Sequence, residues 1–394
     1  MILQYKHSDS IPQYLVALFL FLSPIEAFLV FMNAGTLLKY YQIISIIIMM
    51  MILVASEKKL KLNNLILVLI VFLMYMSMSL LWTESIIRGA MVMRSCLLQV
   101  VFIVFAVQFD YDAKAFKYMQ IAMILGGILL SFLVLFNGKT YADYSNRFSI
   151  YINDDNSIDP NNLGGLLVTS IALLFPMTVK GMLKNTFKWG GLLLLVVALL
   201  MTASRGAVLA CVCAVFVCML LQKNFKKKFK YILIIAIAVI ALIFINRNSN
   251  VNFIGNLFER FQEGGGSNRV DIWEHSISAF VEKPILGSGL GASPNVIRRY
   301  YGVSIGSHNT FITFLLEGGI VLFALFVLLI FNVYKKLRGS LFYGVIACET
   351  ASLVCSFFID TYNKKIFWTP LLLCFIALKI KKDDGDLADG KEVK

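Results

Sequence analysis

The feature that most constrains this chain is a series of long apolar runs spread along its 394 residues. A helix needs roughly 17 to 25 apolar residues to cross the ~30 Å hydrocarbon core of a membrane. A hydrophobic share of 59%, with only 15% charged residues, also exceeds what a soluble fold of this length can bury. We therefore predict an all-α polytopic membrane protein with about twelve transmembrane helices, at approximately 12–31, 36–55, 63–82, 89–108, 116–137, 163–180, 188–203, 206–222, 230–246, 309–334, 341–359 and 366–381.

Basic residues orient these predicted helices, because cytoplasmic loops of membrane proteins are enriched in Lys and Arg. When the loops are alternated, one side receives the lysine clusters at 58–61, 180–188 and 223–230, together with both termini. We expect this side to be cytoplasmic. Nine of the ten arginines fall outside or near the outer ends of spans, and Arg338 is the exception. Because a guanidinium binds phosphate in two-point fashion, they indicate an anionic ligand on the outer face; simple pairing with acids or lipid headgroups is the alternative.

The same alternation predicts the domain organisation. Residues 1–246 form the first nine helices, with an external loop at 138–162 that contains Arg147 and four aspartates. Residues 247–308 are too many for a linker between adjacent helices, so we expect a large external lid. Residues 309–381 form the last three helices, and 382–394 form a cytoplasmic tail.

The stretch "TASRGAVLA" holds Arg205, the only charge between residues 189 and 222. As one helix of ~1.5 Å rise per residue, this stretch would be about 51 Å long, which exceeds the bilayer, and lysines flank both of its ends. The chain must therefore turn back on the outer side, at Ser204, Arg205 and Gly206. An arginine just below the interface costs up to ~3 kcal/mol unless it faces protein or water, so Arg205 is a functional candidate.

Within the lid, "SNRVDIWEHSISAFVEKPILGSGLG" predicts an amphipathic helix near the membrane interface, with Asn268 as its cap. Its apolar stripe comprises Val270, Trp273, Ile277, Phe280 and Val281. Arg269 stands in the first turn, where the helix dipole repels a cation, so we expect an anion nearby. The amides of "GSGLG" are a weaker phosphate-binding candidate, since glycine clusters more often mark ordinary turns.

The lid ends at "SHNTFITFLLEGGIVLF", where His308 precedes a predicted membrane helix and Asn309 is a possible cap. The positive end of the helix dipole disfavours an imidazolium, so the His308 ring is expected to be neutral and able to accept a proton. On position alone, a general base and a hydrogen-bonding interfacial histidine are equal alternatives. Glu317 lies ~13 Å deeper along that helix and is not expected to share a site with His308.

In this order and topology, "SRGA", "NRVDIW" followed by "KPILGSGLG", and "SHNTFITFLLEGGI" resemble the O-antigen ligase and O-antigen polymerase (Wzy-type) superfamily of bacterial membrane glycosyltransferases. The stretch "DPNNLGG" is also similar to that family. The resemblance covers roughly residues 155 to 335, whereas the first five spans match only in hydropathy. It implies a GT-C-like membrane fold in the inner membrane, with the active site facing the exterior.

The resemblance implies metal-independent, inverting transfer of glycan from a polyprenyl diphosphate to a sugar hydroxyl. Arg205 and Arg269 would hold the diphosphate, and His308 would deprotonate the acceptor hydroxyl. Further contacts to substrate are assigned to Arg298, Arg299, Asn309 and Arg147. The expected partners are polyprenyl-diphosphate-linked glycans, membrane lipids and a chain-length regulator, with no nucleic acid, no metal and no cofactor. The one DxD triplet, 110–112, lies on the predicted cytoplasmic side, away from this chemistry.

Three alternatives stay open at this point. A ligase differs from a polymerase only in its acceptor, and we favour a polymerase on the appearance of "SHNTFITFLLEGG" alone. A flippase for lipid-linked sugars would need paired repeats and buried polar groups, for which only Glu26, Arg94, Glu349 and Asp360 are candidates. A structural subunit would not explain why one histidine and two arginines converge on one membrane face.

Overall fold

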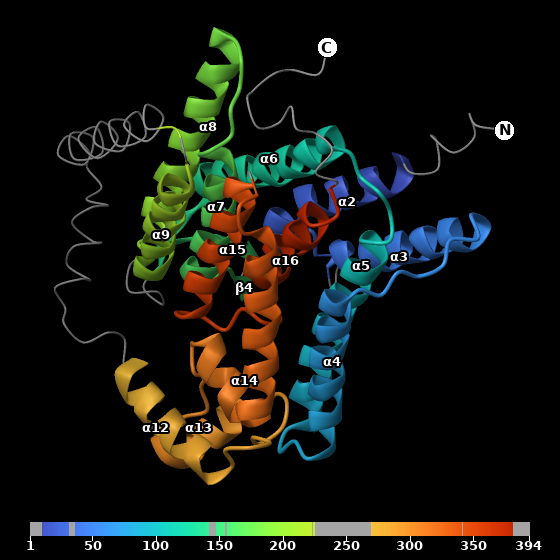
Figure 1. The fold of residues 1–394 in the computed structure, drawn as a ribbon. Helices are drawn as coiled ribbons and strands as arrows, with labels where there is room; N and C mark the ends of the chain where they lie inside the picture. The colour runs from blue at the N-terminus through green and yellow to red at the C-terminus, as the bar shows by residue number, and fades with distance from the viewer. Residues whose placement is uncertain are drawn as a thin grey trace. The chain divides into compact units, whose positions relative to one another are not determined.

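A computed structural model describes residues 10–30, 36–141, 147–153, 156–222, 224, 269–340 and 342–380, and most of them are helical (Figure 1). Thirteen α-helices are present in these ranges, and seven helical segments are long and apolar enough to cross a membrane. Their bounds are Ser10–Phe28, Leu37–Ala55, Asn64–Leu81, Ile86–Ala106, Ala113–Asn137, Met182–Met201 and Thr310–Leu337. The first combines α2 (Ser10–Leu22) with η1 (Ser23–Phe28), and the third combines α4 (Asn64–Met78) with η3 (Ser79–Leu81).

The other long apolar segments are α3 (Leu37–Ala55), α5 (Ile86–Ala106), α6 (Ala113–Asn137), α8 (Met182–Met201) and α14 (Thr310–Leu337). Four shorter apolar helices are α7 (Pro160–Leu174), α9 (Arg205–Leu221), α15 (Tyr343–Ser356) and α16 (Lys365–Ala377). Together these segments coincide with eleven of the twelve predicted runs. The remaining run, 230–246, lies outside the described residues, as does most of the proposed lid before residue 269. A polytopic membrane protein is therefore confirmed.

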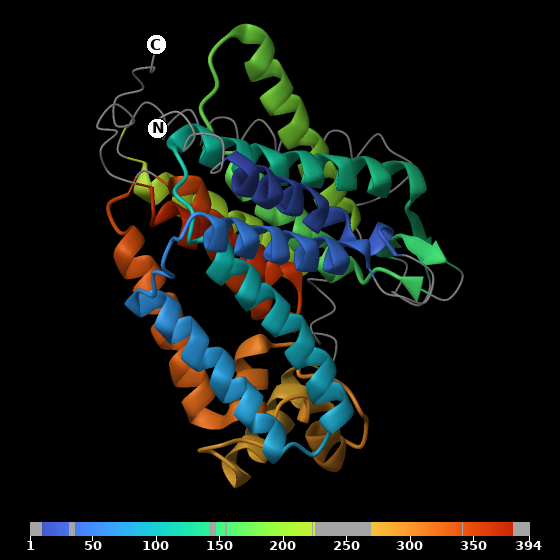
Figure 2. The ribbon, with the colours of Figure 1, turned by 90° about the vertical axis from the view of Figure 1, so that its right-hand side faces the viewer.

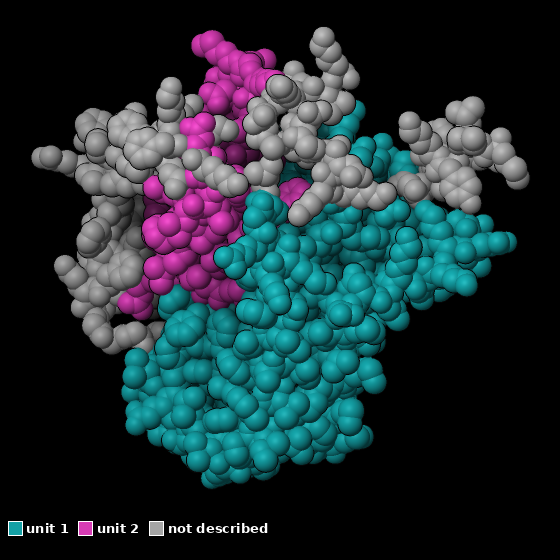
Figure 3. All heavy atoms as spheres, in the orientation of Figure 1, with its two compact units in different colours: residues 1–123, 267–341, 356–394 teal, residues 124–266, 342–355 magenta. Residues whose placement is uncertain are grey.

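The chain divides into two compact units, which are coloured separately in Figure 3. Unit 1 comprises residues 1–123, 267–341 and 356–394, and unit 2 comprises residues 124–266 and 342–355. Unit 1 thus holds α2 to α5, α16 and α14, together with two lid helices, α12 (Arg269–Glu282) and α13 (Ser293–Tyr301). Unit 2 holds α7, α8, α9 and most of α15.

The core of unit 1 is built around α14, which packs along α4 (Figure 2). Phe314 of α14 meets Phe72 of α4 edge-on, with ring centroids 5.7 Å apart, and both rings are fully buried. Phe326 joins Phe314 to Phe367 of α16. Aromatic rings gain from such edge-to-face contacts beyond simple burial, so this cluster fixes α14, and with it the start of that helix at the end of the lid.

Loops at the two ends of unit 1 follow the predicted alternation. At the predicted outer end, the α4–α5 loop contacts the lid through Trp82, Thr83 and Glu84, and the α15–α16 loop contacts the lid at His308. At the predicted inner end, the Lys61 amide donates to Gln108, and Lys379 pairs with Asp110 at 3.6 Å. The loops that contact one another at each end are thus loops that the predicted topology places on the same side of the membrane.

Unit 2 is centred on α7, which is buried along almost its whole length and packs against α8 and α9. A Cβ added to Gly164 of α7 would lie 2.6 Å from the Ala207 Cβ of α9, so glycine is needed for this close approach. The loop 138–162 was predicted only as a polar segment. Its described residues form two small antiparallel sheets, β1 (Lys139–Tyr141) with β2 (Arg147–Ser149) and β3 (Tyr151–Asn153) with β4 (Asn156–Ser157), and Ile150 and Ile158 beside these strands are buried.

Candidate active site

The turn around His308 is built by its own sequence. Asn309 is the N-cap of α14, and its Oδ1 accepts hydrogen bonds from the Phe311 and Ile312 amides at 3.0 and 3.2 Å. The capping role predicted for Asn309 is therefore confirmed. His308 directly before it has a φ of 53°, which lies in the left-handed region. A residue other than glycine pays roughly 1–3 kcal/mol for such a conformation, so surrounding contacts must hold it there.

Asp360, in the loop between α15 and α16, supplies the main contact that holds this turn. Its Oδ2 accepts the His308 backbone N–H at 3.1 Å, and its Oδ1 accepts the Thr313 hydroxyl at 2.7 Å. A Cβ at Gly306 would lie 2.7 Å from Oδ2, so only glycine leaves room for this carboxylate. Asp360 thus clamps the His308 turn and the first turn of α14 with one carboxylate.

Trp273 of α12 holds the same turn from the other side. Its indole Nε1 donates to the Ser307 carbonyl at 2.9 Å, and its ring packs edge-on against Phe357. Arg269 stands four residues earlier on α12, which places both side chains on one face, about 6 Å apart along the helix axis. The structure therefore brings Arg269 and the His308 turn to one region of unit 1.

Within the described residues α12 begins at Arg269, and the predicted cap, Asn268, lies outside them. Buried Ile272, Ser276 and Ala279 face the lid core. Val270, Ile277 and Val281 are 66%, 42% and 65% exposed. Trp273 and Phe280 of the predicted stripe pack against this core, so the stripe is divided between the lid core and the exposed side of the helix. An exposed row of this kind is typical of a helix at a membrane interface.

Arg205 occupies the first position of α9 in unit 2. The chain turns back between α8 and α9, as predicted, but the turn is at residues 202–204, and Arg205 and Gly206 begin α9. Ser204 caps α9 by accepting from the Ala207 amide. Ala203 in this turn also has a left-handed φ, of 46°. Arg205 and Arg269 therefore each stand at a helix N-terminus, where the dipole repels a guanidinium and attracts an anion.

The "DPNNLGG" segment contacts the Arg205 turn directly. Asp159 caps α7 by accepting from the Asn161 amide at 2.6 Å, and the Ser204 hydroxyl donates to Asn161 Oδ1 at 3.0 Å. Two of the segments that carry the family resemblance thus form one small structure in unit 2. Of the four aspartates in the predicted loop 138–162, Asp159 is this cap, and Asp154 and Asp155 lie outside the described residues.

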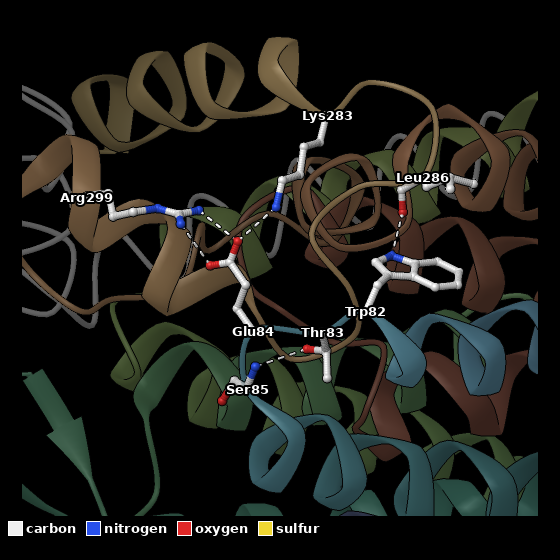
Figure 4. A network of polar contacts seen from close by, with 7 residues as sticks. All are labelled: Trp82, Thr83, Glu84, Ser85, Lys283, Leu286 and Arg299. Atoms are coloured by element: carbon white, nitrogen blue, oxygen red, sulfur yellow. Dashed lines mark hydrogen bonds and ion pairs between the residues drawn. The ribbon is translucent and has the colours of Figure 1, made fainter.

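Arg298 and Arg299 lie in the last turn of α13, and their surroundings differ. Arg299 binds Glu84 through both guanidinium nitrogens at 3.1 Å, and Lys283 reaches the same carboxylate at 3.0 Å (Figure 4). Arg298 is exposed and has no carboxylate partner among the residues in the described ranges. The pair between Arg299 and Glu84 anchors the lid to the α4–α5 loop.

This anchor also shifts the acidity of Glu84. Burial alone would raise the pKa of this carboxyl, but hydrogen bonds and charge from Lys283 and Arg299 outweigh burial, so the pKa lies below the usual glutamate value. The carboxylate is therefore charged at neutral and mildly acidic pH, and the lid contact is present throughout that range.

The "GSGLG" segment binds a carboxylate of the protein itself. Gly291 and Ser293 amides donate to the buried side chain of Glu317, the latter at 3.2 Å, and the Tyr362 hydroxyl donates to its other oxygen at 3.1 Å. The Gly289 amide donates to the Glu317 carbonyl at 2.8 Å. The structure therefore gives these amides an internal acceptor, and the weaker candidate of a phosphate site in "GSGLG" is not supported.

The glycines of this segment serve close backbone packing. Gly287, Gly289 and Gly291 have φ values of 67°, 90° and 78°, and a Cβ on any of them would lie within 2.6 Å of another backbone. Opposite them, α14 is kinked at Gly319, whose φ is 64°. Glu317 was expected to lie away from the His308 turn because of its position along the helix. Its contacts with the "GSGLG" segment agree with that expectation.

The predicted site residues are divided between the two units. Arg147 lies in β2 of unit 2, where its backbone pairs with Tyr141. Arg205 also belongs to unit 2, whereas Arg269, Arg298, Arg299, His308 and Asn309 belong to unit 1. The structure thus groups the last five in one unit, and the convergence of Arg205 with His308 and Arg269 in a single cavity stays a prediction.

Sequence reasoning missed the residues that position this site. Asp360 was considered only as a buried polar group, Trp273 only as part of an apolar stripe, and Glu84 not at all. A signal was present for the first two, because "IDTY" and "DIW" stand at the outer ends of predicted elements, close to the predicted level of His308. Their partners lie 52 and 34 residues away, which no local pattern reveals.

Comparison with known proteins adds one finding. Residues 190–327 match the Wzy_C family, described as O-antigen ligase. This range includes Arg205, Arg269 and His308 but leaves out "DPNNLGG" and Asp360. No curated protein matches the chain. Residues 190–327 are therefore similar to the Wzy_C family, which agrees with the resemblance noted in the sequence, and the match does not decide between an O-antigen polymerase and a ligase.

Proposed function

We propose that this polytopic membrane protein polymerises polyprenyl-diphosphate-linked repeat units into surface polysaccharide on the outer leaflet of the bacterial inner membrane. The observation that carries the proposal is the His308 turn. A histidine at the start of a membrane helix is held in a strained backbone conformation by Asp360, and Trp273 ties it to the helix that begins at Arg269. Strain of this kind persists where function requires a fixed side chain.

In the proposed reaction, the His308 ring takes the proton of an acceptor sugar hydroxyl as that oxygen attacks the anomeric carbon of the donor. The new bond joins this oxygen to the anomeric carbon, and the bond from that carbon to the diphosphate oxygen breaks. The electron pair of the broken bond stays on the departing polyprenyl diphosphate. A single displacement of this type inverts the anomeric configuration.

Arg205 and Arg269 are proposed to bind the diphosphate, whose negative charge grows as it departs. Each guanidinium stands at the first position of a helix, so the helix dipole acts on the same anion with the same sign. Preorganised charges of this kind stabilise a developing anion more than the ground state, which lowers the barrier. A good leaving group needs no general acid, and the proposal includes no metal.

The test is glycan transfer in cells that depend on this protein for surface polysaccharide. His308→Ala should abolish polymer while the protein stays in the membrane. Arg205→Lys and Arg269→Lys keep the charge but lose the two-point geometry, so each should impair transfer strongly. Normal polymer in the His308 variant would remove the base from the mechanism, and normal rates in both lysine variants would remove the diphosphate clamp.

A ligase is the second candidate, because the matching family is described as O-antigen ligase. The two activities share the donor and differ in the acceptor, which is lipid A core for a ligase. Deletion of the gene separates them. Single repeats attached to lipid A core would indicate a polymerase, whereas long chains that accumulate on the carrier lipid would indicate a ligase.

A further inference from the structure

Unit 1 contains a second candidate site, away from the residues assigned above. A cavity of about 620 Å³ lies between the beginning of α3, the middle of α5 and the start of α16. This volume is within the ~300–1,000 Å³ range of ligand pockets. Glu26, Lys39, Arg94, Asn363 and Lys365 supply its charged and polar lining. By loop alternation, these residues belong to the outer half of the protein.

The cavity is cationic. Lys39, Arg94 and Lys365 oppose a single acid, Glu26, which gives its lining a formal charge of about +2 at neutral pH. Arg94 stands ~12 Å along α5, inside a candidate membrane span, and it forms no ion pair with any carboxylate in the described ranges. An arginine in a span without a carboxylate partner is costly, so Arg94 is a candidate for binding an anion.

Lys365 shows that this site is built rather than incidental. Its side chain is buried, with 7% exposure, and its Nζ donates to Gln42 Oε1 at 2.7 Å. Gln42 and Gln99 exchange hydrogen bonds of 3.1 and 3.2 Å, which fixes the amide that orients the lysine. The ring of Phe19 lies 5.2 Å from Nζ. A buried ammonium that has only neutral partners at contact distance favours a negative ligand in the adjoining cavity.

The rest of the lining is apolar. Ile43 and Ile46 of α3 face Leu97, Leu98 and Val101 of α5 across the cavity. A cationic end beside an aliphatic wall is complementary to a molecule with an anionic head and a hydrocarbon chain. We propose that this pocket binds the phosphorylated head of a membrane lipid, with the phosphate at Lys39, Arg94 and Lys365 and the chain against α3 and α5.

The pocket is connected to the His308 turn through one short segment. Asn363 follows Asp360 in the same loop, Lys365 is the first residue of α16 directly after that loop, and Asp360 binds the His308 amide. Within the function proposed above, on which this step rests, the occupant is the lipid-linked acceptor. An acceptor keeps its diphosphate during transfer, so it needs a phosphate site separate from the one that holds the leaving group.

Lipid binding by full-length protein in detergent tests the pocket without turnover. Native mass spectrometry would compare polyprenyl diphosphate, uncharged polyprenol and phosphatidylglycerol. The starting protein would carry Arg205→Ala and Arg269→Ala, which removes the proposed donor site. To this background we would add Lys39→Gln with Arg94→Gln, or the matched control Arg88→Gln, which removes an exposed arginine of α5 that does not line the pocket.

The expected result is at least tenfold weaker binding of the phosphorylated lipid after the Lys39 and Arg94 changes, and unchanged binding after the Arg88 change. Preference for polyprenyl diphosphate would identify the occupant as a lipid-linked substrate, and preference for phosphatidylglycerol would identify it as a bulk phospholipid. Equal binding by the pocket and control variants, or polyprenol binding as tight as that of the diphosphate, would overturn the proposal. Loss of transfer in His308 variants bears only on the proposed function.

Discussion

The Asp360 carboxylate accepts the backbone N–H of His308 at 3.1 Å across 52 residues of sequence. The same side chain accepts the Thr313 hydroxyl, so it fixes both the residue before the α14 cap and the first turn after it. Because the hydrogen bond goes to the His308 backbone, Asp360 fixes the backbone from which the imidazole extends. This makes Asp360 a positioning residue for the proposed base.

Removal of the Asp360 carboxylate should therefore weaken glycan transfer without removing the protein from the membrane. We expect Asp360→Ala to lower transfer by roughly 10- to 100-fold, by analogy with the loss of residues that orient metal-bound histidines in other proteins. Asp360→Asn keeps one acceptor oxygen, so its transfer rate should lie between that of the unchanged protein and that of Asp360→Ala. Polymer length distributions in cells measure the effect. Asp112→Ala, which removes a helix cap at the predicted cytoplasmic end, is the control; equal losses in both variants would contradict a specific role.

The left-handed φ of His308 allows a variant that separates chemistry from stability. Glycine adopts this conformation without strain, whereas alanine does not. His308→Gly should thus abolish transfer while raising the free energy of unfolding by about 1 kcal/mol relative to His308→Ala. Thermal unfolding of the purified proteins gives the stability, and polymer analysis gives the activity. Transfer by the glycine variant at the normal rate would show that the imidazole is dispensable.

The sequence was sufficient for those features that depend on neighbouring residues. Run lengths predicted eleven helical segments in the described ranges, the 189–222 stretch predicted the turn at Arg205, and "SHNT" predicted the Asn309 cap. These three features follow from the thickness of the hydrocarbon core, the rise of a helix and the chemistry of helix caps, all of which depend on a single continuous stretch of the chain.

Features that depend on tertiary packing could not be predicted from the sequence. The amides of "GSGLG" have the composition of an anion site, but the anion that they bind is Glu317, 24 residues beyond Ser293. On α12, the buried face includes Ile272 with the small residues Ser276 and Ala279, none of which belongs to the predicted apolar stripe. The composition of a segment shows which groups it can bind, whereas the tertiary fold determines which group it does bind.

The lid anchor at Glu84 should respond to pH in a defined direction. The pKa of this carboxyl is lowered in the folded protein, so its stabilising contribution is complete above the ordinary glutamate range and is lost only as pH falls below that range. Hydrogen exchange of residues 283–301, corrected for the intrinsic rate, should be unchanged from neutral pH to about pH 5 and should rise below about pH 4.

Glu84→Gln tests whether this carboxyl causes the pH response. The amide cannot form ion pairs with Lys283 and Arg299, so exchange in 283–301 should already be faster at pH 7, by a few-fold for partly exposed pairs of this kind. Its dependence on pH should then be lost. Glu274→Gln changes an exposed carboxyl on α12 and is the control. If both variants keep the normal pH dependence, another group is responsible.

Alanine substitutions at two glycines with nearly equal φ allow the cost of backbone strain to be distinguished from the cost of steric contact. Gly289 has a φ of 90°, and an added Cβ would lie 2.2 Å from the Thr83 Cα, whereas Gly302, with a φ of 82°, has open space around that position. Alanine at either site pays the ~1–2 kcal/mol of left-handed strain, but only Gly289→Ala must also push the lid off the α4–α5 loop, at a further ~1–3 kcal/mol. The thermal midpoint should therefore fall several degrees further for Gly289→Ala; equal midpoints would mean that the loop yields freely.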